Sequence, residues 1–130
     1  MDCPHCGVPM VAFDVPSALR EHAPATASAA AICPECLSLV AADAADAEPR
    51  FDRISDAFPA EERAAVPMAL AVGLLDSLAL HRGSIETLLA AVEEAGVDPL
   101  LLLDRLDAQG GVQPTFDIRR RRHQLEQLRD

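Results

Sequence analysis

The sequence predicts an α+β protein in which a small β unit precedes an α-helical bundle of four or five helices. Three observations support this prediction. Two cysteine pairs and several strand-like segments fall within residues 1–40, and the apolar residues after position 50 recur with a helical period. Between these parts, AADAADAEPR carries no large apolar side chain. We therefore expect a β unit at 1–40, a linker at 41–50 and a helical domain at 51–130.

Three short strands are expected in the β unit, in MVAFDV (10–15), SAAAI (28–32) and LSLV (37–40). Turns that are rich in Pro, Gly and Ala separate these segments. A unit of this size buries too little apolar surface to fold alone, so it needs a covalent or metal cross-link.

The helical domain is expected to begin with a short helix on which Phe51, Ile54 and Phe58 share one face and which Pro59 ends. Residues 60–80 follow and are apolar on almost every side. Such a pattern is typical of a central helix that is surrounded by others.

The next helix lies in SIETLLAAVEEAG, with Gly83 expected to close the preceding helix in a left-handed cap and Ser84 to cap this one. Its apolar stripe consists of Ile85, Leu88, Leu89 and Val92.

Two further helices are expected before the chain ends. Asp98 and Pro99 supply an N-cap acceptor and a fixed φ at the first helical position, and Gly110 is expected to end that helix. The last helix lies in PTFDIRRRRHQLEQLRD, whose apolar side carries Ile118, Leu125 and Leu128.

The charge and the apolar stretches bear on the location of the protein. The formal net charge is −10 and every basic residue is arginine, a composition that suits a halophilic protein kept soluble by self-repulsion. No cationic segment precedes an apolar one at the N-terminus, so we expect a cytoplasmic protein. The most apolar stretch, 64–81, contains Pro67, Gly73 and Asp76, which favours a buried helix over a membrane span.

The four cysteines form the pattern C-x2-C-x26-C-x2-C. The first pair, in Cys3-Pro4-His5-Cys6, resembles the motif of strongly oxidising thiol oxidases. That chemistry needs a strand that leads into the motif and a helix that follows it. Neither fits here, because two residues precede Cys3 and the following GVPMVAFDVP contains two prolines. Disulfides are also disfavoured, because cytosolic reductants keep thiols reduced.

The second pair, Cys33-Pro34-Glu35-Cys36, indicates a metal site instead. Each C-x2-C turn directs two sulfurs at one centre, and two such turns supply the four thiolates of a tetrahedral site. We therefore predict that one ion is held by Cys3, Cys6, Cys33 and Cys36. Such a site leaves no open position, so it is structural and not catalytic.

These turns resemble the CPxCG knuckles of zinc ribbons, in particular those of the small CPxCG zinc-finger proteins of haloarchaea, a group without an assigned function. The resemblance covers residues 3–7 and 33–36 and implies a β zinc ribbon. The first knuckle is complete at Gly7, whereas Leu37 stands where the pattern has Gly in the second.

Zinc is the expected metal, with iron as the alternative. Rubredoxins hold iron with two similar turns, but they pack aromatic residues around the site, and residues 1–40 contain only Phe13. With four thiolates available, His5 and His22 are expected to be solvated and not to bind the metal.

No residue pattern indicates an active site, so we expect no enzyme and no small-molecule substrate. His81 and His123 have no serine or cysteine placed to pair with them. Three functions remain: an adaptor with a protein partner, a nucleic-acid-binding regulator of transcription or translation that uses Arg119–Arg122, and an iron electron carrier. We favour the adaptor, because a helix spreads four consecutive arginines over all its sides, and Arg122 and Glu126 form an i, i+4 pair.

Overall fold

The structure is a computed structural model that describes residues 1–109 and 111–128 as a small sheet packed on helices. The strands are β1 (Val11–Asp14), β2 (Ala29–Ile32) and β3 (Leu39–Ala41), and the α-helices are α1 (Glu62–Leu74), α2 (Arg82–Glu94), α3 (Pro99–Gln109) and α4 (Ile118–Leu128). An α+β fold with the sheet at the N-terminus and four α-helices after it confirms the predicted class within the described residues.

The three strands form an antiparallel sheet in the order β1-β2-β3. Val11 lies opposite Ile32, which in turn lies opposite Leu39, so the predicted strand segments pair in sequence order. Side chains alternate between the two faces with period two. Phe13 and Ile32 face the helices, whereas Ala12 and Ala31 face the cysteines.

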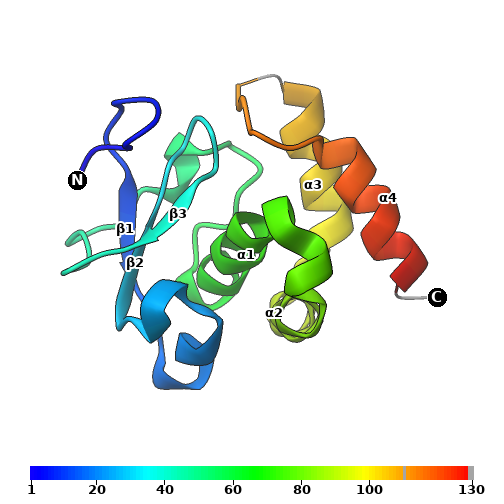
Figure 1. Cartoon of the computed structure of the whole chain (residues 1–130), viewed down its shortest axis with the longest axis horizontal. Helices are drawn as coiled ribbons and strands as arrows, with labels where there is room; N and C mark the ends of the chain where they lie inside the picture. Colours follow the sequence, from blue (N-terminus) through cyan, green and yellow to red (C-terminus); the bar gives the residue numbers. More distant parts are fainter. Residues whose placement is uncertain (110, 129–130) are drawn as a thin grey trace.

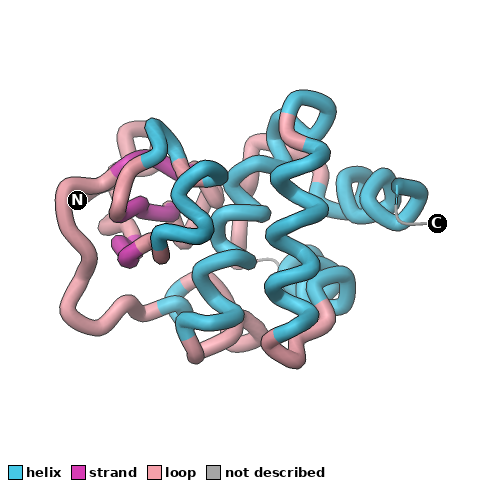
Figure 2. Tube along the Cα trace, turned by 90° about the horizontal axis from the view of Figure 1, so that it is seen from below, coloured by secondary structure: helices cyan, strands magenta, loops and turns pink. Residues whose placement is uncertain are grey.

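The elements lie in layers along the long axis of the molecule (Figure 1). The sheet lies at one end, α1 and α2 occupy the centre, and α3 and α4 lie at the other end, near the C-terminus. The view from below shows the strands grouped on one side of the helices (Figure 2). Helices α1 and α2 therefore lie between the sheet and the pair formed by α3 and α4.

The central apolar segment is shorter as an α-helix than the sequence predicts. Helix α1 ends at Leu74, and a 3-10 segment, η4 (Leu75–Leu80), continues with a kink at Ser77. Asp and Ser are weak helix formers because their side chains compete for backbone hydrogen bonds, and Asp76 and Ser77 fall at this break.

By length and composition Glu62–Leu80 is apolar enough to cross a membrane, but 61% of it is buried inside the protein. The core helix of a soluble protein has the same composition, because it is surrounded by other elements on all sides. The segment is therefore accounted for as the central core helix.

Two further details of the predicted helices are wrong. Phe51 begins a 3-10 turn (Phe51–Arg53) and not a helix that extends to Phe58. The Ser55 hydroxyl accepts the Ala57 amide at 3.0 Å, and Pro59 disfavours helical backbone at the residue before it. Both aromatic side chains are nevertheless buried.

The predicted boundary at Gly83 and Ser84 is also displaced. Gly83 lies inside the first turn of α2, because that helix already begins at Arg82. The hydroxyl of Ser84 does not cap the helix, since it bonds Nδ1 of His22 at 2.9 Å. The stripe of α2 is buried as predicted, and Asp98 Oδ1 caps α3 through the amides of Leu100 and Leu101. The predicted stop at Gly110 lies outside the described residues.

The sheet and the helices share one apolar core. Val11 and Phe13 belong to the same buried cluster as Phe51, Met68 and Leu88. Phe13 and Phe51 lie 5.6 Å apart between ring centroids, so an aromatic contact joins β1 to the helical part.

Two further contacts join segments that are far apart in the sequence. A Cβ at Gly73 would lie 2.4 Å from Leu39 Cβ, so β3 packs directly on α1 where only glycine fits. Asp46, within the predicted linker, exchanges hydrogen bonds with the backbone of Ala12 at 3.0 and 3.1 Å. The division at 41–50 stays a prediction about independent folding.

Candidate metal centre

Two tight turns present the cysteines, and their backbone hydrogen bonds match. The amide of Gly7 donates to the Cys3 carbonyl at 2.8 Å, and the amide of Leu37 donates to the Cys33 carbonyl at 3.0 Å. In each turn the amide two residues after the first cysteine points at its sulfur, with a distance of 3.4 Å from His5 N to Cys3 Sγ and from Glu35 N to Cys33 Sγ. Amides that point at sulfur stabilise the thiolate form, which is the form that binds metal.

The second turn keeps this geometry although it lacks the glycine of the pattern. Gly7 has φ 73° and Leu37 has φ 65°, so both turns close in the left-handed region. For leucine this conformation costs about 1–2 kcal/mol. The Leu37 side chain is 2% exposed and belongs to the core that the sheet shares with the helices. Burial of this side chain offsets the backbone strain and anchors the second knuckle in that core.

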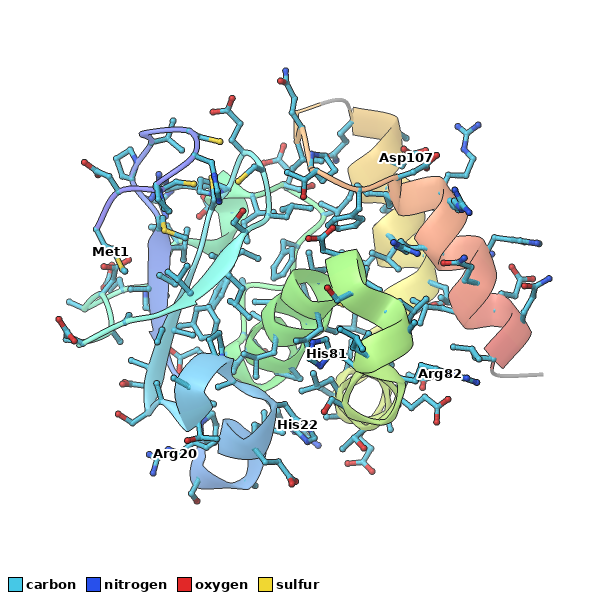
Figure 3. All side chains as sticks on the ribbon, in the orientation of Figure 1. Met1, Arg20, His22, His81, Arg82 and Asp107 are labelled. Carbon is cyan, nitrogen blue, oxygen red and sulfur yellow. The ribbon has the colours of Figure 1, made fainter. Side chains whose placement is uncertain are left out.

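The sulfur atoms of the four cysteines in these two turns converge at one end of the sheet. The Sγ atoms of Cys3, Cys6, Cys33 and Cys36 all lie within 4.8 Å of one another, and those of Cys3 and Cys36 are 3.7 Å apart. Tetrahedral zinc with bonds of about 2.3 Å needs sulfurs about 3.8 Å apart. The donor set and its spacing therefore fit one tetrahedral ion. Figure 3 shows sulfur atoms gathered beside the N-terminal loop.

The thiols affect one another's pKa values. The pKa of Cys6 is raised to about 12, mainly by a hydrogen bond with Cys36 and also by burial, and burial is the main cause that raises the pKa of Cys33. Burial also acts to raise the pKa of Cys36, but hydrogen bonds with the hydroxyl and the backbone of Ser38 and with Cys33 and Cys6 together outweigh it and lower that pKa to about 7. Four thiols in one cluster resist full ionisation unless a cation compensates their charge, so binding of a metal ion here would release protons.

The surroundings of the cysteines are small and aliphatic. Met10, Ala12 and Ala31 form a buried cluster with the three buried cysteines on the face of the sheet that points away from the helices. Phe13 lies on the opposite face, in the main core. Among the described residues, this cluster around the sulfurs contains no aromatic side chain.

Other elements hold the two knuckles in place through contacts that the sequence does not reveal. The amide of Gln113, in the loop before α4, donates to the Glu35 carbonyl at 2.6 Å, and the Arg53 guanidinium donates to the Pro9 carbonyl at 2.6 Å. Ser38 Oγ lies 3.0 Å from Cys36 Sγ. The contact of Ser38 with Cys36 is local, but no spacing rule predicts the contacts of Gln113 and Arg53, because these residues reach the knuckles only through the tertiary fold.

The histidines differ from one another in environment. His5 is exposed as predicted, but the expectation that His22 is solvated is wrong, because its side chain is only 8% exposed. Its Nδ1 bonds Ser84 and its Nε2 lies 3.5 Å from a Glu21 carboxylate oxygen. His22 thus ties the loop between β1 and β2 to α2, and it lies away from the cysteines (Figure 3).

Substitutions at Leu37 separate backbone strain from burial. We expect Leu37→Ala to lower the free energy of unfolding by about 2–5 kcal/mol, because it removes a buried side chain and keeps the strain. Leu37→Gly should cost about 1 kcal/mol less than Leu37→Ala, because glycine adopts positive φ without strain. Urea unfolding of the metal-loaded protein measures both values.

Gly7→Ala is the matched control, because its φ is similar and an added Cβ meets no atom within 4 Å. Gly7→Ala should lower the free energy of unfolding by about 1 kcal/mol, through backbone strain alone. If Leu37→Gly is less stable than Leu37→Ala, as is usual elsewhere in proteins, backbone strain at this position does not matter.

Comparison with known proteins identifies a family but no function. Searches of curated proteins and of solved structures found no match. A model of the DUF6276 family, described as a family of unknown function, matches residues 2–129, which is nearly the whole chain. The paired knuckles, the three-stranded sheet and the helices after it therefore lie within one family unit. The chain belongs to the DUF6276 family.

Proposed function

We propose that this protein is a cytoplasmic, non-catalytic adaptor that is built around one structural zinc ion and binds a protein partner. The convergence of four cysteine sulfurs from two matching knuckles is the observation that carries the proposal. Cys3, Cys6, Cys33 and Cys36 would hold the ion, which would cross-link the ends of the small sheet.

The choice of zinc rests on the donor set and its surroundings. Four thiolates in a tetrahedral arrangement suit zinc or iron. The buried cluster around the cysteines contains small aliphatic side chains, whereas rubredoxins pack aromatic residues around their iron. With four protein ligands, zinc has no position for water, so the site supplies no Lewis-acid chemistry.

The adaptor role is favoured over nucleic-acid binding by the environment of the arginine run. Arg122 pairs with Asp104 at 2.9 Å and with Glu126, and Arg119 pairs with Asp107 at 3.3 Å. The pairs with Asp104 and Asp107 attach α4 to α3, and all three pairs leave fewer arginine charges for phosphates. On a chain of net charge −10, the remaining arginines would give weak phosphate affinity at high salt.

Metal analysis tests the zinc assignment. The protein purified with all four cysteines intact should contain one zinc per chain and be colourless, because zinc has a filled d shell. Elemental analysis and the visible spectrum measure this. Stoichiometric iron with visible absorption would overturn the zinc assignment and support an electron carrier.

Affinity purification at native salt tests the partner class. We expect a protein to co-purify with the metal-loaded chain and to remain after nuclease treatment. Recovery of nucleic acid that depends on Arg119–Arg122 would instead favour the regulator.

A further inference from the structure

A surface groove lies at the end of the molecule opposite the metal centre, between η4, the start of α2 and α4. Its volume is about 300 Å³, which is at the small end of the range for ligand sites. It is lined by Leu78, Ala79, Arg82, Arg121, Gln124, Gln127 and Leu128. None of these residues carries a carboxylate or an aromatic ring.

The lining of the groove is largely apolar. Leu78 is 5% exposed, Leu128 is half-buried and Ala79 is exposed. Leu80, which follows directly, leaves 82% of its surface exposed and is one of the few large apolar residues that do so in the described chain. An apolar groove beside an exposed leucine is the kind of surface that marks a binding site for another molecule.

Among residues 1–109 and 111–128, two arginines at the groove have no carboxylate partner. The Arg82 side chain makes no hydrogen bond or ion pair with the residues that the structure describes, and Figure 3 shows it directed toward the C-terminal end of α4. The Arg121 guanidinium donates only to neutral oxygens, at 2.9 Å to Gln124 Oε1 and at 3.3 Å to the Asp76 carbonyl. By contrast, Arg119 and Arg122 are neutralised by carboxylates of α3 and α4.

This combination of charge and apolar lining specifies the chemistry of an occupant. The net charge of the chain is −10, but the two unpaired arginines make the groove locally positive, so they favour acidic groups of a partner. The apolar lining favours an aliphatic side chain of that partner. Nucleic acid fits less well, because the groove offers no aromatic ring on which a base can stack and the chain as a whole repels phosphates.

We propose that this groove is the partner-docking site and that it binds an acidic peptide segment that presents aliphatic side chains beside carboxylates. The inference rests on the proposed adaptor function and names its partner class. An aliphatic side chain of the peptide lies against Leu78 and Leu128, and its carboxylates pair with Arg82 and Arg121.

Binding of a defined peptide to the full, metal-loaded chain tests the proposal. The probe is a short synthetic peptide that repeats Glu-Leu-Leu-Glu. Amide chemical shifts in NMR spectra should change in η4, at the start of α2 and in α4, and not in the knuckles. Peptides that repeat Lys-Leu-Leu-Lys or Glu-Ser-Ser-Glu should bind at least about tenfold more weakly, because each lacks one half of the required chemistry.

Variants of the groove give the quantitative test. Arg82→Gln and Arg121→Gln should each weaken the Glu-Leu-Leu-Glu peptide about two- to fivefold, as expected for the loss of one exposed ion pair. Ala79→Glu should weaken it further, because it adds bulk and a repelling charge to the groove. Arg105→Gln and Ala90→Glu are matched controls at exposed positions outside the groove, and they should leave the affinity within about twofold.

The proposal would be overturned by no peptide binding at millimolar concentration, by chemical-shift changes that cluster elsewhere, or by equal effects of groove and control variants. Binding of a single-stranded RNA oligonucleotide at this face in preference to the peptide would also overturn it. If a co-purified protein partner is insensitive to the groove variants, the adaptor function stands and only the docking site is wrong. If the chain holds no zinc but the peptide binds as expected, the docking site stands and the metal assignment fails.

Discussion

Replacement of any one of Cys3, Cys6, Cys33 or Cys36 by serine is expected to unfold the N-terminal sheet. Structural zinc binding contributes on the order of 10 kcal/mol to small zinc-binding units, and loss of one thiolate removes most of that contribution. Circular dichroism and the dispersion of NMR signals from residues 1–40 measure the loss. A strong chelator should have the same effect on the unaltered protein.

Adding zinc back after chelation provides the control for this experiment. Zinc added back after chelation should restore the unaltered protein, whereas the serine variants should remain unfolded in the same region. Ser38→Ala removes the hydroxyl next to Cys36 but no ligand, so it should retain the metal. A serine variant that keeps a native sheet without metal would show that the cysteine cluster is not a structural metal site.

The second large effect is expected from Phe51→Ala. Phe51 is 2% exposed, with its ring centroid 5.6 Å from that of Phe13 on β1 and 5.8 Å from that of Phe58. Truncation of a buried phenylalanine costs about 3–5 kcal/mol. Because the ring lies between the sheet and the helices, we expect signals of both parts to melt together and at a lower temperature. Thermal unfolding followed by circular dichroism and by NMR measures this.

Leu101→Ala is the matched control, because Leu101 is 46% exposed. This variant should lower the free energy of unfolding by well under half as much as Phe51→Ala does.

The fragment 51–130 completes the test of the predicted domain division. The helical pattern predicts that this fragment stays helical in chelator, and the shared core leads us to expect that it is less stable than the same residues in the whole chain. Equal melting temperatures, or separate melting of the sheet in Phe51→Ala, would show that the two parts fold independently.

The sequence by itself determined the class of fold and which cysteines come together. Period-two and helical patterns are local properties, so the strands and the stripe of α2 could be found without coordinates. The C-x2-C pairs are local turns, and any fold that joins both at one point makes a tetrahedral site, which is why the cysteine cluster matched the prediction. The caps at Asp98 and the Arg122–Glu126 pair are likewise contacts between near neighbours.

Only the tertiary structure decided which of these parts touch. Ser84 does not cap α2, because His22, remote in sequence, takes its hydroxyl. Leu37 tolerates positive φ because a core formed by distant helices buries its side chain, which a motif comparison cannot reveal. The arginine run is uniform in sequence, yet α3 neutralises Arg119 and Arg122 while Arg121 remains at the groove. Burial and charge pairing depend on residues far apart in the chain, and their energies are set when the elements pack.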